Sequence, residues 1–309
     1  MITTFNTMPS PASRRIRYRL PIIAALLLVL FVTAGCGLAI RIGYGQGSPL
    51  AFRWLDGYVD FNDAQSLRVR AALDDWFAWH RRTQLPDYAD FLARVETAVL
   101  VDTTPEQMCA WAVELRARVD VSLERARPVL AEVLPTLTLQ QIANIERKYA
   151  EANKEYRAEF VQSSPTRRRH AAIEREIERF EKFYGPLDDA QRERVARGVA
   201  ESPRDAEASY AERLRRQQDA LAVLRRLAAA GATRAEADAE IQAYLQRLDR
   251  SPREDHRRYA ERLSEFNCSF AASLHNATSG EQRREAAKRF KAYENDLRGL
   301  AADALAAAS

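Results

Sequence analysis

Helix-start signals recur along most of this chain and restrict it to a helical fold. One signal is a small polar residue followed three positions later by Gln, which together satisfy two free backbone N–H groups at a helix start. These pairs are Asn62 with Gln65, Thr104 with Gln107, Thr138 with Gln141, Asp188 with Gln191, and Ser279 with Gln282. Ser-Pro is a second signal, in which Ser caps and Pro takes the first helical position. It occurs at 164–165, 202–203 and 251–252, and Thr233 with Glu236 forms another capping box.

Composition and periodicity agree with these signals. Glycine is sparse, at 11 of 309 residues, and the chain is rich in the helix formers Ala, Arg, Glu and Leu. Apolar residues follow helical spacing in three stretches: Ile142, Ile145, Tyr149 and Tyr156; Ile173, Ile177, Phe180 and Tyr184; Tyr210, Leu214, Leu221, Leu224 and Leu227. No stretch alternates with the period of a strand. We expect an all-α fold, either a multi-helix bundle or an array of antiparallel helical hairpins.

The positive net charge belongs to the N-terminal segment alone. The chain has 47 basic and 43 acidic residues, a surplus of four. Residues 1–35 hold four arginines and no acid, so the remainder is neutral; these are Arg14, Arg15, Arg17 and Arg19. A neutral remainder lacks the basic surface that nucleic acid attracts, and we expect no nucleic-acid partner.

These arginines precede an uninterrupted apolar stretch at 20–32, which is typical of a signal peptide. Thr33, Ala34 and Gly35 then lead to Cys36, and this arrangement resembles a bacterial lipobox. We expect a signal peptide at 1–35, lipidation of Cys36, and a lipid-anchored tether rich in Gly, Ser and Pro at 36–51. Because Gly37 rather than Asp follows the cysteine, we expect an outer-membrane lipoprotein that faces the periplasm.

A single inner-membrane span is the alternative anchor. Residues 20–40 carry no charge and are long enough to cross a bilayer, between Arg19 and Arg41. The arginines before this stretch would keep the N-terminus cytoplasmic. Either anchor makes the membrane a partner and delivers the rest of the chain to the periplasm.

The other two cysteines, Cys109 and Cys268, leave their pairing open. An oxidising compartment would permit a disulfide between them. On a helical projection, however, Cys268 lies nearly opposite the apolar stripe that contains Phe266 and Phe270. A disulfide and two free thiols are both compatible with the sequence.

Aromatic residues concentrate at 52–91, a stretch that is either the hydrophobic centre of the fold or a docking surface. We expect a helical domain at 52–201, followed by helices at 202–309 that belong to the same domain or to a second lobe. The candidate partner-binding residues in the aromatic stretch are Trp54, Tyr58, Trp76, Trp79, His80 and Tyr88.

No catalytic or phosphate-binding motif is present. His80 shares an apolar helix face with Trp76 and Trp79, which is typical of a structural histidine that donates to a backbone carbonyl. His170 and Glu174 lie one turn apart in a charged helix, as pairs on solvated faces commonly do. We expect no catalytic residue, no metal site and no cofactor.

Several short motifs in the first two thirds of the chain resemble a family of uncharacterised proteobacterial lipoproteins, a domain of unknown function. The resemblance covers roughly residues 20–200. Its motifs are W-x-x-x-Y-x-D, W-H-R-x-x-x-L-P-x-Y and T-P-E-Q, carried here by Trp54, Tyr58 and Asp60; by Trp79, His80, Arg81, Leu85, Pro86 and Tyr88; and by Thr104, Pro105, Glu106 and Gln107. The resemblance implies a lipid-anchored helical protein and no established activity.

The L-T-x-x-Q helix start at Leu137 to Gln141 is also similar to helix starts in small helical periplasmic stress chaperones. The expected anchor, the absence of a catalytic motif and the aromatic stretch at 52–91 support our leading hypothesis, a non-enzymatic, lipid-anchored helical protein that binds other envelope proteins as an adaptor or chaperone. The alternative is an envelope enzyme acting on peptidoglycan or lipid, with His80 beside a carboxylate such as Asp87 or Glu96. That enzyme would require His80 at the wall of an open cleft.

Overall fold

The computed structural model describes residues 44–161 and 164–306, and all regular elements in these ranges are helical. The predicted all-α class is confirmed. The helices are α3 (Gly47–Val59), α4 (Asp63–Trp79), α5 (Leu85–Ala98), α6 (Pro105–Val133), α7 (Leu139–Phe160), α8 (Pro165–Tyr184), α9 (Asp189–Glu201), α10 (Ala206–Ala230), α11 (Arg234–Asp249), α12 (Glu254–Asn276) and α13 (Gly280–Ala306). A π-helical turn (His80–Gln84) joins α4 to α5, and a 3₁₀ turn (Leu134–Thr136) follows α6.

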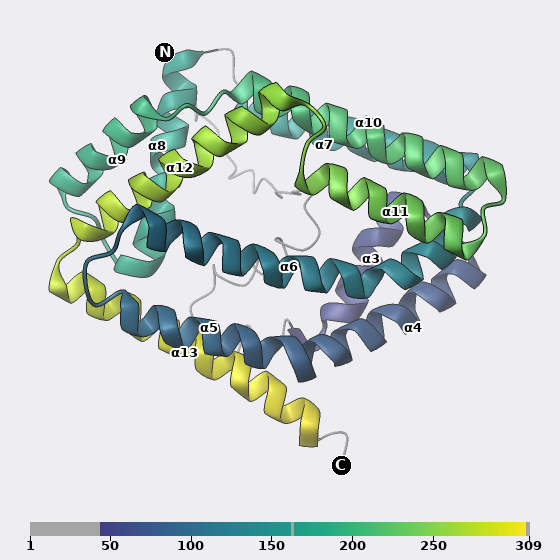
Figure 1. The fold of residues 1–309 in the computed structure, drawn as a ribbon, viewed down its shortest axis with the longest axis horizontal. Helices are drawn as coiled ribbons and strands as arrows, with labels where there is room; N and C mark the ends of the chain where they lie inside the picture. Colours follow the sequence, from purple (N-terminus) through teal and green to yellow (C-terminus); the bar gives the residue numbers. More distant parts are fainter. Residues whose placement is uncertain (1–43, 162–163, 307–309) are drawn as a thin grey trace, which may run out of the picture.

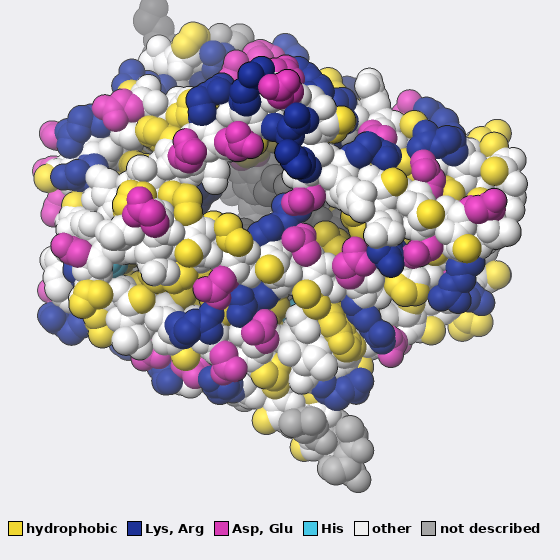
Figure 2. All heavy atoms as spheres, in the orientation of Figure 1, with side chains coloured by type: hydrophobic (Ala, Val, Ile, Leu, Met, Phe, Trp, Pro, Cys, Tyr) yellow, Lys and Arg dark blue, Asp and Glu magenta, His cyan; other side chains and the backbone are white. Residues whose placement is uncertain are grey.

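Helix α6 crosses the middle of an open array (Figure 1). It packs against α4 and α11 toward one end and against α12 toward the other. Helices α3, α7 and α10 complete the first end, while α8, α9, α13 and α5 complete the second. Figure 2 shows that the face seen in Figure 1 is hollowed between α12 and α6, and that acidic and basic side chains mix over it. Helices from the last third of the chain thus pack on helices from the first half.

Several small apolar clusters stabilise the array. One joins α7 to α10 through residues that include Ile142, Ile145 and Leu221. Another joins α8, α9 and α12 through residues that include Ile177 and Leu274. The predicted helical stripes therefore face neighbouring helices, as narrow stripes do in helix-on-helix packing.

Most of the predicted helix starts are confirmed. The capping boxes of α4, α7, α9 and α11 form with their expected residues, and Ser279 and Gln282 make the same reciprocal bonds at the start of α13. Ser164 also caps as predicted, and Thr104 accepts from the Gln107 N–H, but the Gln107 side chain does not form the expected return bond to the Thr104 N–H.

Two of the three Ser-Pro starts were wrong. Helix α10 is capped by Asp205, whose carboxylate accepts from the backbone N–H groups of Glu207 and Ala208, rather than by Ser202. Helix α12 begins after Arg253, not after Ser251. In each case the serine hydroxyl accepts from the backbone N–H two residues later, so Ser-Pro forms a turn before the helix.

Four of the predicted glutamines do more than complete their own caps. Gln65 and Gln141 hydrogen-bond to each other across the starts of α4 and α7, with Gln141 Nε2 2.7 Å from Gln65 Oε1. Gln191 and Gln282 do the same between α9 and α13, also at 2.7 Å. In both pairs, each Gln also donates to the carbonyl two residues before its partner's N-cap; these carbonyls belong to Thr136, Asp60, Ala277 and Pro186. We call the two arrangements the glutamine clasps.

The N-terminal part of the described chain belongs to the packed fold. Residues 47–51, expected in the tether, form the first turns of α3, and Gly47 is buried against the Phe77 ring. Cys36 and the apolar stretch at 20–40 lie outside the described residues. Among the helices in the described ranges, none is apolar over a sufficient length to cross a membrane.

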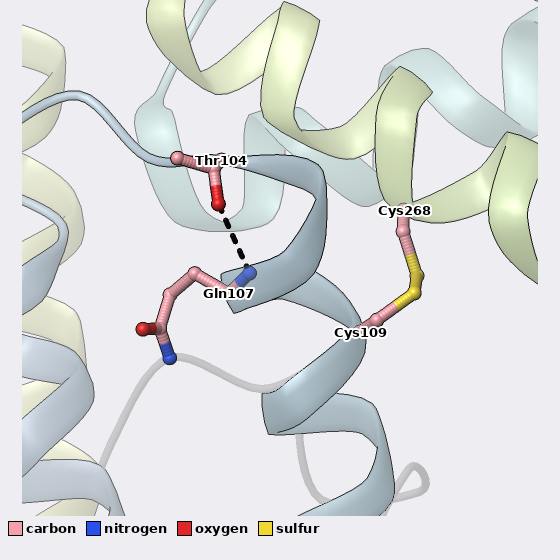
Figure 3. Close-up of a disulfide and its surroundings, with 4 residues drawn as sticks. All are labelled: Thr104, Gln107, Cys109 and Cys268. Carbon is pink, nitrogen blue, oxygen red and sulfur yellow. Dashed lines mark hydrogen bonds between the residues drawn. A yellow bond between two sulfur atoms is a disulfide. The ribbon is translucent and has the colours of Figure 1, made fainter.

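Cys109 and Cys268 form a disulfide between α6 and α12, with their Cα atoms 5.4 Å apart (Figure 3). The helical projection placed Cys268 opposite the apolar stripe of its helix, but α12 is buried on two sides. Phe270 and Leu274 pack toward α8 and α9, whereas Cys268 faces α6 and is 5% exposed. The bridge links residues 159 positions apart and joins the first turns of α6 to α12.

Candidate functional site

The six predicted partner-binding residues separate into two groups. Trp76, Trp79, His80 and Tyr88 surround the junction of α4 and α5, where His80 and Tyr88 are buried. Trp54 and Tyr58 lie on α3 and are partly exposed. The two groups have different surroundings and suit different roles.

His80 is enclosed by aromatic rings. Its ring stacks on Trp76 with 4.7 Å between centroids, and Trp79 and Tyr88 flank it. Its Nδ1 lies 2.6 Å from the Tyr44 hydroxyl, so its partner is a tyrosine and not the backbone carbonyl that we expected. Burial lowers the pKa of His80 to about 4, which keeps the imidazole neutral at physiological pH.

The carboxylates considered as partners of His80 have other partners. Asp87 forms an ion pair with Arg118 at 2.9 Å, and Glu96 lies 3.7 Å from Lys291. Trp76 is itself fixed, because its indole Nε1 donates to the Ser122 carbonyl at 3.0 Å. This enclosure favours a packing role for His80 over acid–base chemistry.

His275 forms a second buried histidine–tyrosine pair, which the sequence did not reveal. Its Nδ1 is 2.8 Å from the Tyr184 hydroxyl, and its Nε2 is 2.8 Å from the Val101 carbonyl. Because a carbonyl only accepts, Nε2 carries the proton and Tyr184 donates to Nδ1. Burial lowers the pKa of His275. The histidine thereby joins the ends of α8 and α12 to the loop before α6.

The remaining histidines do not form a metal site. His170 lies 4.0 Å from Glu174, and both side chains are exposed. His256 lies 3.8 Å from the Glu212 carboxylate, which Arg215 and Arg216 already neutralise. In the described ranges, no three His, Cys, Asp or Glu side chains are grouped to hold a metal ion.

The second predicted group extends into a larger aromatic surface. Trp54 and Tyr58 pair at 4.8 Å between centroids, and Tyr58 contacts Tyr149 of α7 at 6.4 Å. Two helical turns further along α7 and across to α10, the rings of Tyr156 and Tyr210 stack with 5.9 Å between centroids. All five side chains are partly exposed. We call these residues, Trp54, Tyr58, Tyr149, Tyr156 and Tyr210, the tyrosine surface.

Arg213 of α10 lies among these rings. Its guanidinium is 5.0 Å from the centroid of Tyr156, and its charge interacts with all four tyrosines of the surface. Its Nε donates to Asn153 Oδ1 at 2.8 Å, and Asn153 in turn bonds to Gln217. Burial lowers the pKa of the guanidinium, which the tyrosines partly offset.

The charge of Arg213 has no acidic partner in the described part of the chain, and its buried Nη2 has no hydrogen-bond acceptor. Nearby arginines differ. Arg247 pairs with Asp219 at 2.9 Å, and Arg216 pairs with Glu212 at 2.9 Å. Arg157 lies over the Tyr210 ring at 5.6 Å and is exposed to solvent.

The sequence did not predict that the other residues of this surface lie together. Tyr149, Tyr156 and Tyr210 were assigned to the apolar stripes of two separate helices, and Arg213 lies beside the second stripe. The relevant signal was the high tyrosine content of those stripes, since a tyrosine hydroxyl favours a position near water.

Comparison with known proteins places the chain in a family. A family of unknown function, DUF6279, matches residues 57–237, more than half of the chain, and the chain belongs to it. The match continues past residue 201, where we expected the family-like region to end, and reaches α11. No curated protein and no solved structure gives a significant match.

Proposed function

We propose that this protein is a lipid-anchored periplasmic adaptor or chaperone-like protein that binds other envelope proteins through the tyrosine surface. The observation that carries this proposal is a partly exposed aromatic surface on three helices with a desolvated arginine at its centre. Tyrosine, tryptophan and arginine are the residues that dominate the energetics of protein interfaces.

The surface suits clients that vary in sequence. Large amphipathic rings offer apolar contact area while their hydroxyls stay hydrated, and they lose little conformational entropy on binding. Because the chain outside residues 1–35 is neutral, shape and apolar contact would select the partner more than long-range attraction.

The disulfide supports the proposed compartment. Disulfides persist in oxidising compartments such as the periplasm and are rare in the cytosol. Cys109 and Cys268 belong to helices that pack against each other, as expected of a structural bridge. A mass measurement on the N-terminus of the protein from cell envelopes tests the anchor: we expect a diacylglyceryl group on Cys36. An N-terminus that retains residues 1–35 without lipid would contradict the lipoprotein assignment and favour a single span.

Binding to a permanently unfolded protein tests the role of the surface. We expect purified protein to bind fluorescein-labelled, reduced and carboxymethylated α-lactalbumin in an anisotropy titration. Replacing both Tyr156 and Tyr210 by alanine should weaken binding at least about tenfold, since two aromatic contacts contribute more than about 1.4 kcal/mol.

Leu139→Ala is the matched control, because Leu139 also lies on α7 and is 72% exposed. It should bind like the wild type, and circular dichroism should show that both variants are folded. Equal weakening by L139A, or no binding by the wild type, would count against the proposed surface.

A further inference from the structure

Three neighbouring aromatic rings, two of them in the tyrosine surface, each have an arginine over them. The ring centroids of Phe160 and Tyr156 are 4.7 Å apart, and those of Tyr156 and Tyr210 are 5.9 Å apart. The distances from guanidinium carbon to ring centroid are 4.8 Å for Arg175 over Phe160, 5.0 Å for Arg213 over Tyr156, and 5.6 Å for Arg157 over Tyr210. We call these six residues the arginine ladder, and they come from α7, α8 and α10.

The arginines of the ladder differ from other arginines on the same helices. Arg147 of α7 pairs with Glu151 at 2.9 Å, and Arg179 of α8 pairs with Glu176 at 3.0 Å, whereas the three ladder arginines form no ion pair within the described ranges. Their contacts are with rings, and an aromatic face attracts a cation without neutralising its charge. The ladder therefore keeps the capacity to pair with an acid.

A fourth arginine, Arg204, adds charge beside the ladder. Burial and the charge of Arg204 lower the pKa of Arg175, and the charge of Glu159 offsets this only in part. The neighbouring Asp205 carboxylate accepts from two backbone N–H groups as the cap of α10. Positive charge therefore gathers at this edge of the tyrosine surface, although the chain outside residues 1–35 is neutral as a whole.

Solvent exposure decides which of these arginines a partner can reach. Arg157 and Arg204 are exposed, and Tyr210 beside Arg157 is partly exposed. The Nη2 atom of Arg213 is buried, so we assign this residue no contact with a partner. The N–H bonds of a guanidinium lie in its plane, so an arginine over a ring can still donate from its edge. A partner on the tyrosine surface would meet Arg157 first.

We propose that the polypeptides bound by the tyrosine surface are acidic, and that an Asp or Glu side chain of the partner pairs with Arg157. Arg204 and Arg175 would add to the attraction at contact distance. A carboxylate is the natural acceptor for an arginine edge, because it can take two parallel N–H bonds. This inference rests on the proposed function, because it names the charge of the partner that the same surface binds.

A single-stranded nucleic acid fits the ladder less well. Proteins that bind it stack successive bases on free aromatic faces. Here the rings of Tyr156 and Tyr210 stack on each other with an interplanar angle of 14°, and each ring also has a guanidinium over it. The rings thus offer few free faces to bases, while the arginine edges still suit carboxylates.

Three fluorescein-labelled peptides test the proposal by anisotropy. They are amidated at the C-terminus and share one sequence of apolar and aromatic residues, except that two central positions hold Glu, Gln or Lys. A charge-assisted pair should make wild-type protein bind the Glu peptide about tenfold more tightly than the Gln peptide. The Lys peptide should bind more weakly than the Gln peptide, because like charges then face each other.

Arg157→Gln should bind the Glu peptide with the affinity that wild type shows for the Gln peptide. Arg204→Gln should lose part of the preference. Arg147→Gln is the matched control, because Arg147 is also exposed on α7 but is paired with Glu151, and it should keep the full preference. Circular dichroism should show that all three variants are folded, since the three side chains are exposed.

The outcomes separate this inference from the proposed function. Equal binding of the Glu and Gln peptides by wild type overturns the acidic partner and leaves the proposed function standing, whereas no binding of any peptide overturns both. Loss of the preference in R147Q to the same extent as in R157Q overturns the role of Arg157. Tighter binding of a fluorescein-labelled oligonucleotide of twelve thymidines than of the Glu peptide overturns the choice of a polypeptide.

Discussion

His80 and His275 each share a hydrogen bond with a tyrosine from another part of the fold. Both are buried, and burial lowers the pKa of each imidazole. Each imidazole therefore takes up a proton at a higher pH in the unfolded chain than in the folded chain. Protonation of these histidines favours unfolding.

We expect the protein to lose stability in mild acid. The pKa of His80 falls from 6.5 to about 4 on folding, so its contribution is complete above pH 6.5 and is lost as the pH falls toward 4. The loss from this residue should be about 3 kcal/mol, measured by urea unfolding at a series of pH values. His80→Gln should flatten the profile, whereas His170→Gln, at an exposed residue, should not change it. A wild-type profile with no slope between pH 7 and 4 would contradict the assignment.

Sequence reasoning recognised the packing role of His80 but not its partner. The apolar spacing of Trp76, Trp79 and His80 predicts burial within one helix. Tyr44 lies 36 residues earlier, in a stretch that we expected to be a tether, and no local pattern connects the two. His275 was missed for the same reason, because Tyr184 is 91 residues away.

At the scale of helices, the glutamine clasps turn a local capping signal into a connection between helix starts. A clasp glutamine accepts from its own N-cap N–H and donates to a partner segment far away in the chain, as Gln141 does to Asp60 and Gln65. Gln107 has the same spacing from its cap residue, yet its side chain extends away from Thr104 and is exposed (Figure 3).

This contrast provides a matched pair of variants. Gln141→Ala should lower the free energy of unfolding by about 2–3 kcal/mol, because the Asp60 carbonyl and Gln65 Oε1 each lose the hydrogen bond that Gln141 Nε2 donates. Gln107→Ala should cost no more than about 0.5 kcal/mol, as exposed substitutions usually do. Urea titrations of both variants measure the difference. Equal losses would show that the clasp adds nothing to an ordinary cap.

Capping chemistry explains why most helix starts were predicted well and why the start at Ser202 was not. A box such as Thr138 with Gln141 involves four consecutive residues, so the sequence contains all its parts. At Ser202 the chain offered two caps, and Asp205 was the better placed because it accepts from two backbone N–H groups. Sequence alone does not decide between two adjacent caps.

At the scale of the whole molecule, the Cys109–Cys268 disulfide connects the central helix α6 to α12. We expect its removal by Cys109→Ser with Cys268→Ser to lower stability by about 3–5 kcal/mol, because the bridge closes a long loop in the unfolded chain. Urea unfolding with and without dithiothreitol measures this loss, and the double variant should no longer respond to the reductant. Free thiols in non-reduced protein, detected by alkylation and mass spectrometry, would contradict the bridge.

The tyrosine surface forms only when helices from distant parts of the chain pack together. Trp54 and Tyr58 were expected from their local aromatic density, but Tyr149, Tyr156, Tyr210 and Arg213 meet them only through the packing of α3, α7 and α10. No sequence signal indicates that Arg213 lacks an acidic partner among the residues that the structure describes, because the helix around it is rich in both charges.

The most direct test of the central claim is photo-crosslinking in living cells, with a photoreactive amino acid placed at position 156 or at position 139. Both positions lie on α7, but only Tyr156 belongs to the tyrosine surface, while Leu139 is the more exposed apolar residue. We predict crosslinked adducts with other envelope proteins from position 156 and few from position 139. Adducts of equal yield from both positions, or none from position 156, would contradict the claim that this surface binds partners.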